Sequence, residues 1–369
     1  MALKETTVRV LHRTGLQVFE PLVRLAALEE PKQQLSRIAI HLGMPLLAML
    51  GFLLLWSLAA ARIETAYGTL PTPGQVWDEG GSLVEAHFET RRAEEAFYVD
   101  QQEQAALYLA EAAALRAGLD RTAGRERVKL EKQIGRLEDR AERAGAKRFT
   151  ATPTYLEQIV TSLKTVFTGF VLASLVAVPL GILCGMSPAF MSALNPLIQI
   201  FKPVSPLAWL PIVTILVGAL YTTEPQEAWF EKSFITSAIT VALCSLWPAL
   251  VNTAQGVSNV DRDHVNVSRV LQLTWFEHVR LIVLPSALPL IFTGLRISLG
   301  VGWMVLIAAE MLAQNPGLGK FIWDMFQNGS SQTLARIMVA VFTIGLIGFA
   351  LDRGMVALQR CVTFEGAAA

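Results

Sequence analysis

The chain has 369 residues, of which 53% are hydrophobic and 17% are charged, and its mean hydropathy is +0.43. An ordinary soluble domain carries about a quarter charged residues, so this composition indicates a membrane protein with several spans. The formal net charge is zero, which argues against a nucleic-acid-binding surface. The three cysteines are far apart and indicate neither a disulfide framework nor a metal site.

The first uncharged run lies between Arg37 and Arg62 and follows a charged segment at residues 1–40. At about 1.5 Å per residue the run crosses the hydrocarbon core, so it predicts a first transmembrane helix at residues 41–62. The run begins too late and is too long for a cleaved signal peptide. We therefore expect it to remain as a membrane helix.

Residues 63–155 form a long connection, and residues 89–148 within it are charged and helical in pattern. Apolar residues recur there at spacings of four and three, which predicts an antiparallel helical hairpin with a narrow apolar seam and a turn between Gly118 and Gly124. Two interpretations stay open: a solvated spacer, or a docking surface for a partner outside the membrane. The predicted seam consists of Tyr108, Ala112, Leu115, Leu119, Leu130, Ile134, Leu137, Ala141 and Ala144.

Residues 156–353 contain further apolar runs, which predict five more spans. Ser187-Pro188 and Asn195-Pro196 interrupt the longest run, and the third span is rich in proline. The expected fold class is an all-α integral membrane protein of about six transmembrane helices, with the hairpin inserted between the first two. The five further spans are expected at 159–186, 204–221, 234–251, 288–308 and 337–351, before a tail at 354–369.

Lysine and arginine in short loops predict the orientation. They gather in residues 1–40, between the fourth and fifth spans, and in the tail, whereas the loop after the third span carries Glu224, Glu227 and Glu231 against Lys232. Both termini are therefore expected in the cytoplasm and the hairpin on the outer side. The loop between the fourth and fifth spans then faces the cytoplasm, where nucleotide-driven partners are found.

Residues 263–289 form an amphipathic segment in this cytoplasmic loop. One apolar stripe predicts a short helix, and a second stripe begins at Phe276. Leu284-Pro285 and Pro289 are expected to stop or bend the chain as it re-enters the membrane. A short helix at the membrane surface suits receiving force from a soluble partner, and a passive connector is the alternative. The first stripe consists of Val267, Val270, Leu271 and Thr274.

The sequence contains no G-x-x-x-x-G-K-[ST] phosphate loop, so we expect no ATPase site and no catalytic residue in this chain. Residues 317–320, Gly-Leu-Gly-Lys, match only the end of that motif and are interpreted as a turn.

Ionisable groups inside spans are candidates for function, because burying a charge in lipid costs several kcal/mol. Arg296 either extends to the cytoplasmic face or lines an anion path. Glu310 is a gate, a helix cap or an interfacial carboxylate, and Trp303 either lines a pathway or packs against a neighbouring helix. Lys202 is predicted to be an interfacial anchor.

Residues 282–285, Ile-Val-Leu-Pro, end a segment that resembles the cytoplasmic coupling loop of permease subunits of bacterial binding-protein-dependent ABC importers. That signature is Glu-Ala-Ala, three residues, Gly, nine residues, Ile-x-Leu-Pro. Counting back places Gln272 at the glycine and Asn266-Val267-Ser268 on the triplet, so only the Leu-Pro end is kept. The runs NVSRVLQL, LPSALPLIFTGLRISLGVGWMVLIAAEML, TSLKTVFTGFVLASLVAVPLGILCGMS and FKPVSPLAWLPI are similar to the nitrate, bicarbonate, taurine and sulfonate permease group, and most similar to nitrate permeases.

The resemblance covers about residues 161–353 and the segment LPTPGQVW at 70–77, but not the hairpin. It implies a type-I importer fold and ATP-driven import of nitrate or nitrite across the bacterial inner membrane, with bicarbonate, cyanate, taurine or alkanesulfonate as alternatives. It further implies two cytoplasmic ATPase subunits that use ATP and Mg, a periplasmic solute-binding protein, and a second permease copy in a homodimer surrounded by membrane lipid. No cofactor is expected on this chain. The implied coupling residues are Asp261, Asp263, Asn266, Val267, Ser268, Arg269, Gln272, Leu284 and Pro285.

Two functions of other classes stay open on the sequence alone. A secondary transporter or channel without ATP predicts charged relays deep in several spans, and only Arg296 is clearly inside one. A membrane-anchored scaffold built around the hairpin leaves the proline-rich spans and the coupling-like loop unexplained.

Overall fold

The computed structural model describes residues 20, 23–24, 31–65, 68–118, 124–222 and 230–362. Several sequence predictions fall outside these residues: most of the charged segment 1–40, the turn of the hairpin with Leu119, the acidic pair Glu224 and Glu227, and residues 363–369 of the tail. The chain divides into two compact units, one of Met1–Gly80 with Gln158–Ala369 and one of Gly81–Glu157.

The first span is longer than predicted. Helix α3 (Pro31–Ile38), the π-helical turn η2 (Ala39–Gly43) and helix α4 (Met44–Ala60) follow one another without a break, and the candidate span runs over Gln33–Ala60. Two short antiparallel strands, β1 (Glu64–Thr65) and β2 (Gly68–Thr69), follow it. Trp56 stacks on Phe342 at 5.2 Å and donates a hydrogen bond to the Pro71 carbonyl at 3.0 Å, which fixes the end of α4.

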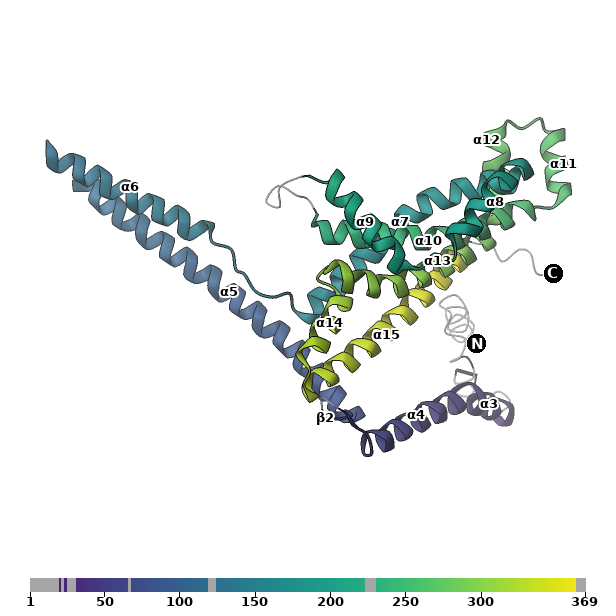
Figure 1. Ribbon diagram of the computed structural model, residues 1–369, viewed down its shortest axis with the longest axis horizontal. Helices are drawn as coiled ribbons and strands as arrows, with labels where there is room; N and C mark the ends of the chain where they lie inside the picture. The colour runs from purple at the N-terminus through teal and green to yellow at the C-terminus, as the bar shows by residue number, and fades with distance from the viewer. Residues whose placement is uncertain are drawn as a thin grey trace. The chain divides into compact units, whose positions relative to one another are not determined.

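The remaining spans form a helical bundle in the same unit (Figure 1). Over the described residues, five helices are long and apolar enough to cross a membrane, or six if one bent pair is a single span. This agrees with the prediction of about six spans. Besides the first span, the bundle consists of six helices that belong to candidate spans and of the shorter helix α14 (Leu318–Asn328). The six are α7 (Tyr155–Met186), α8 (Pro188–Phe201), α9 (Pro206–Leu220), α10 (Lys232–Ser258), α13 (Leu284–Ala313) and α15 (Ser331–Val362).

The bent pair is α8 and α9, whose axes differ by 100°. Ser187 and Ser205 cap the two helices through their side chains, and each is followed by a proline in the first helical turn. The predicted interruption at Ser187-Pro188 is therefore present, whereas that at Asn195-Pro196 is wrong because Pro196 lies inside α8.

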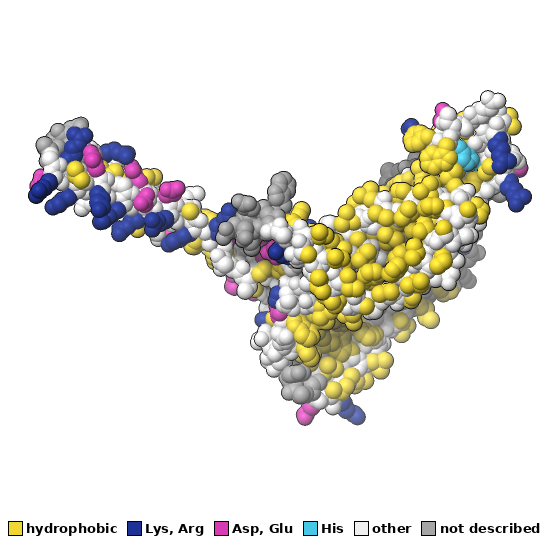
Figure 2. All heavy atoms as spheres, turned by 45° about the horizontal axis from the view of Figure 1, so that its top comes forward, with side chains coloured by type: hydrophobic (Ala, Val, Ile, Leu, Met, Phe, Trp, Pro, Cys, Tyr) yellow, Lys and Arg dark blue, Asp and Glu magenta, His cyan; other side chains and the backbone are white. Residues whose placement is uncertain are grey.

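Helix α10 is the centre of the bundle, with α7 on one side and α13 on the other (Figure 1). Glycines allow the backbones of α7 and α10 to approach closely. A Cβ atom at Gly181 would lie 2.8 Å from the Leu250 carbonyl, and one at Gly185 would lie 2.6 Å from the Ala254 carbonyl. Hydrophobic side chains cover the visible outer face of this bundle, as a lipid-facing surface requires (Figure 2).

The other unit is the predicted hairpin. Helix α5 (Pro73–Gly118) starts well before residue 89, because Thr72 and Gln75 form reciprocal hydrogen bonds around Pro73 at its N-terminus. Helix α6 (Arg125–Ala146) returns along it, with Arg116 and Glu138 paired at 2.5 Å. The seam is confirmed in its centre, where Ala112, Ile134 and Leu137 are buried together with Tyr108 and Leu115 against them.

Candidate functional site

The loop between α10 and α13 contains two short helices, α11 (Arg262–Val270) and α12 (Trp275–His278). Asp261 caps α11 by accepting a hydrogen bond from the Asp263 backbone N–H at 3.0 Å. The predicted stripe through Thr274 is wrong at its end, because Thr274 instead starts α12 in a capping box with Glu277. The loop thus places two helices, rather than one, at the end of the bundle (Figure 1).

Gln272 lies between the two helices with φ of 53°, in the left-handed region. Glycine adopts this conformation at little cost, whereas a side chain with a Cβ is strained there. The resemblance places Gln272 at the glycine of the coupling-loop signature. The backbone therefore keeps the shape for which that glycine is suited, although the residue has changed.

The predicted coupling residues of α11 divide between the two sides of the helix. Ser268 is 5% exposed, and its hydroxyl is 2.7 Å from Nδ1 of His278, so it fastens α11 to α12. Asp263, Asn266 and Arg269 are exposed to solvent. An apolar group of residues that are each at least half exposed accompanies them, which we call the coupling surface: Val267, Val270, Leu271, Trp275 and Phe276.

Leu284 and Pro285 do not stop or sharply bend the chain as predicted. A π-helical turn, η4 (Val279–Val283), continues directly into α13, and Pro285 occupies the first turn of α13, where proline is tolerated. Pro289 lies inside α13. The coupling loop is thereby joined to a continuous helix of 30 residues.

Arg296 of α13 forms a bidentate ion pair with Asp352 of α15, with Nη2 donating to Oδ2 at 2.9 Å and Nε donating to Oδ1. Two parallel hydrogen bonds fix the guanidinium more firmly than a single one. The charge is thus matched inside the chain, an arrangement that neither predicted role included. Asp352 also accepts from Arg353 at 2.7 Å.

Trp303 packs between two helices, and Lys202 is exposed to solvent. Trp303 is 6% exposed, and its Nε1 donates to the Ile344 carbonyl at 3.0 Å, which joins α13 to α15. Lys202 is exposed at the C-terminus of α8.

Glu310 lies at the other end of α13 and is fully buried. The Ser162 hydroxyl of α7 is 2.8 Å from both of its carboxylate oxygens, and the Gly319 backbone N–H donates to Oε2 at 2.9 Å. The Leu318 N–H in turn donates to the Ser162 hydroxyl at 2.9 Å. Glu310 and Ser162 therefore hold the N-terminus of α14, where an acceptor is favoured by the free N–H groups and the helix dipole.

The segment Gly317–Lys320 is not only a turn, since α14 begins at Leu318. A side chain at Gly317 would overlap the Glu310 carboxylate, and one at Gly319 would overlap the Ile307 carbonyl. The two glycines are thus explained by close packing around a buried carboxylate rather than by phosphate binding.

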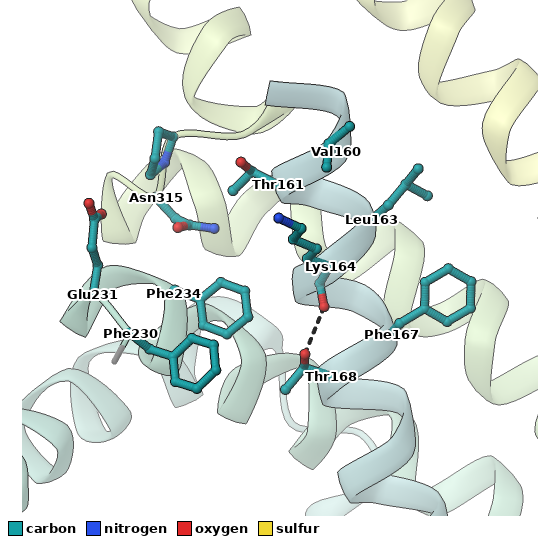
Figure 3. Close-up of a pocket in the computed structure, with 11 residues that line it drawn as sticks. Val160, Thr161, Leu163, Lys164, Phe167, Thr168, Phe230, Glu231, Phe234 and Asn315 are labelled. Carbon is teal, nitrogen blue, oxygen red and sulfur yellow. Dashed lines mark hydrogen bonds between the residues drawn. The ribbon is translucent and has the colours of Figure 1, made fainter. Parts of the chain in front are cut away.

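A cavity of about 740 Å³ lies beside this cluster, and sequence reasoning missed it (Figure 3). The sequence feature that could have indicated the cavity is Lys164, a cation near the start of an otherwise apolar span. The cavity lies at the N-terminal ends of α7 and α10, the opposite end of the bundle from α11. Its lining is Val160, Thr161, Leu163, Lys164, Phe167, Thr168, Phe230, Glu231, Phe234, Asn315 and Pro316.

Comparison with known proteins identifies the family. The profile described as "Binding-protein-dependent transport system inner membrane component" matches residues 177–363, half of the chain. The nitrate import permease protein NrtB of Leptolyngbya laminosa is 37% identical over 195 residues, which are 53% of this chain and 64% of that protein. The bicarbonate transport system permease protein CmpB of Synechocystis sp. is 39% identical over 206 residues, which are 56% of this chain and 68% of that protein. The match therefore spans just under two thirds of the NrtB chain.

The taurine transport system permease protein TauC of Escherichia coli is 32% identical over 215 residues, which are 57% of this chain and 70% of that protein. A solved chain of the MetNI methionine ABC transporter, in inward facing conformations, is 14% identical and aligns over 57% of this chain and 96% of that chain, with a TM-score of 0.49.

The chain belongs to the family of inner membrane components of binding-protein-dependent transport systems. It is a multi-pass membrane protein with the all-α fold of type-I ABC importer permeases, as the coupling-loop resemblance predicted. Within the family its relatives include the nitrate, bicarbonate and taurine permeases.

Proposed function

We propose that this chain is the permease subunit of an ATP-driven importer that moves a small oxyanion across the bacterial inner membrane. Nitrate or nitrite is the first candidate, and bicarbonate, cyanate, taurine and alkanesulfonate are the alternatives. Relatives named as nitrate or bicarbonate permeases, at 34% to 39% identity, support this class of substrate.

The coupling surface is the observation that carries the proposal. Two short helices present exposed apolar side chains, Trp275 and Phe276 among them, together with Asp263 and Arg269 at the end of a membrane bundle. An exposed apolar group rimmed by charges is typical of a protein interface. We assign it to cytoplasmic ATPase subunits, which bind ATP and Mg, while this chain has no catalytic site of its own.

The bundle offers a path for the coupling. A displacement of α11 and α12 passes through η4 into α13, whose 30 residues are about 45 Å long. At its far end α13 holds α14 through Glu310. A rigid helix of this length transmits a movement as a whole, so closure of the ATPase pair shifts the population between two arrangements of the spans.

The proposed complex contains two copies of this chain, two ATPase subunits and a periplasmic solute-binding protein. Both termini then face the cytoplasm and the α5–α6 hairpin lies outside. The proposed division of the chain is an N-terminal segment at 1–40, the first transmembrane helix at 41–62, the outer loop at 63–155, the transport core at 156–353 and the tail at 354–369.

The test is isolation of the solubilised chain with its partners, followed by uptake in proteoliposomes. We expect an ATPase subunit to co-purify with the chain. We also expect uptake of labelled nitrate or bicarbonate, and the competitor among nitrite, cyanate and taurine that reduces this uptake most indicates the preferred class of substrate. Failure to recover an ATPase, with uptake that survives removal of ATP, would instead support a transporter of the ATP-independent class.

A further inference from the structure

We propose that the cavity around Lys164, which we call the Lys164 pocket, binds the oxyanion at the end of the bundle opposite the coupling surface. The inference rests on the proposed function and adds to it a binding site on this chain. Lys164 belongs to the candidate span Tyr155–Met186, where a cation is costly unless something compensates it. Within the described part of the chain, its ammonium group has no carboxylate within ion-pair distance.

Polar groups from two other elements meet Lys164 in the pocket. Asn315 is 1% exposed and forms part of the lining, and its Nδ2 donates to the Thr165 hydroxyl at 3.2 Å. The Thr165 hydroxyl itself donates to the Thr161 carbonyl at 2.8 Å, so it can only accept from Asn315, which fixes the orientation of the amide. Oδ1 of Asn315 is left without a partner, an unusual state for a buried polar atom; as an acceptor it suits a donor such as the Lys164 ammonium group, so it positions the cation and does not itself bind the anion.

The third contribution is the N-terminus of α10. Its N-cap residue, Glu231, makes no side-chain cap hydrogen bond, so the first N–H groups of a 27-residue helix lack that partner. Uncapped N–H groups and the helix dipole favour an anion nearby. Phe230 and Phe234 stack at 5.3 Å to form an apolar wall of the pocket, and Phe230, Glu231 and Lys164 are exposed, so the pocket is open to solutes.

Glu231 is the one lining group of opposite sign, and its position decides between two uses of Lys164. Its carboxylate accepts from the Ser233 hydroxyl at 3.4 Å, and the Lys164 side chain extends toward the side of the pocket that holds Asn315 (Figure 3). The ammonium group thus remains available to a small oxyanion. Alternatively, Lys164 and Glu231 form an ion pair in another conformation of the transporter, which we call the Lys164–Glu231 latch. Uptake would then require both charges equally.

Uptake by the complete transporter separates these uses. We expect Lys164→Gln to raise the KM for nitrate or bicarbonate about tenfold, the loss of one charge-assisted contact, and Lys164→Arg to raise it less. Glu231→Gln should lower the KM or leave it unchanged, because it removes a repulsive charge. The control is Lys202→Gln, which removes the same charge from the exposed end of α8 and should behave as wild type.

Equal KM values for wild type and Lys164→Gln would overturn the site, and equal losses in Lys164→Gln and Glu231→Gln would replace it with a latch. If the wild-type transporter moves none of the tested oxyanions, the proposed function fails, and this outcome is distinct from both. Membrane insertion of each variant is checked first, so that a folding defect is not read as a binding defect.

A binding measurement that needs no transport uses the full chain in lipid nanodiscs. Modification of Lys164 by an amine-reactive ester is followed by mass spectrometry with increasing nitrate or bicarbonate, and with gluconate at equal ionic strength. We expect the small oxyanions to protect Lys164, and not Lys202, whatever the lipid. Protection that follows the content of phosphatidylglycerol and ignores the free anion would assign the pocket to a lipid headgroup and overturn the proposal.

Discussion

A buried carboxylate at the end of a membrane helix needs hydrogen-bond donors around it, and close packing restricts which residues can occupy the neighbouring positions. Glu310 accepts hydrogen bonds from Ser162 of α7 and from the backbone of Gly319, so it ties together three helices at one point. Gly317 lies so close that only a residue without a side chain fits. The cluster is therefore a stabilising element for α14 whatever the transported substrate.

We predict that Gly317→Ala destabilises the protein by about 1 to 3 kcal/mol, because the added methyl group overpacks against Glu310. Thermal unfolding of the purified chain in detergent measures the effect. Gly300→Ala is the matched control, since a Cβ at Gly300 meets nothing within 4 Å and Gly300 is exposed on α13, the helix that carries Glu310. Equal melting temperatures for the two variants would contradict the packing argument.

The left-handed backbone at Gln272 leads to the opposite expectation. Gln272→Gly should stabilise the loop by up to about 1 kcal/mol, because glycine relieves the strain but loses more entropy on folding. Hydrogen exchange of the α11–α12 segment reports the change locally. Gln255→Gly, at an exposed position inside α10, should be destabilising, and a gain in both variants would show that conformation is not the cause.

The sequence indicated the charged residues of these sites but not the residues that surround them. Arg296 and Glu310 stood out because they are charges within apolar runs, but their partners could not be predicted. Asp352 lies 56 residues from Arg296 and Ser162 lies 148 residues from Glu310, so only the folded chain brings them together. Lys164 was visible as a charge, whereas the pocket around it depends on α10 and on the turn at Asn315.

At the scale of elements, hydrophobic runs and periodicity predicted the spans and the hairpin well. Errors arose where a local capping signal was overlooked. The Thr274–Glu277 capping box starts α12, where the prediction had continued the first stripe, whereas the start of α9 at Pro206 agrees with the expected span at 204–221. The 100° bend between α8 and α9 depends on packing as well as on proline, and the sequence alone gave no angle.

The coupling surface makes a prediction about energy transfer. Replacing Asp263 and Arg269 together by alanine should lower ATP-driven uptake about tenfold, because contacts worth about 1.4 kcal/mol or more to the ATPase are lost, while membrane insertion stays intact. The control replaces Lys320 and Asp324, a half-buried ion pair on α14 at the other end of the bundle, by alanine. Uptake that is unchanged in the first variant removes these two residues from the coupling.

The hairpin has its own buried seam, so its outer part should be removable. Gln101 donates to the Lys147 carbonyl at 2.5 Å, so residues 102–146 can be replaced by a short Gly-Ser bridge between ends that already meet. We expect the melting temperature of the membrane bundle to stay the same, because the seam residues belong to the removed part. A chain that no longer inserts into the membrane would contradict this. Loss of uptake with normal insertion would support the docking role, and normal uptake the spacer role.

At the scale of the whole molecule, the transport core combines two ends with different tasks. One end carries the coupling surface, which we assign to a soluble partner, and the other holds α14 and the Lys164 pocket. Helices α10 and α13, packed closely through glycines, connect them. This arrangement fits the proposed function, in which the chain moves a solute with energy supplied by another protein.

The most direct test is uptake into proteoliposomes that contain the complete transporter, with its solute-binding protein on the outer side and nucleotide inside. We predict that labelled nitrate or bicarbonate accumulates against its gradient with ATP and Mg, and that accumulation stops when a non-hydrolysable analogue replaces ATP. Equal accumulation with the analogue would contradict the central claim that this chain is the permease of an ATP-driven oxyanion importer.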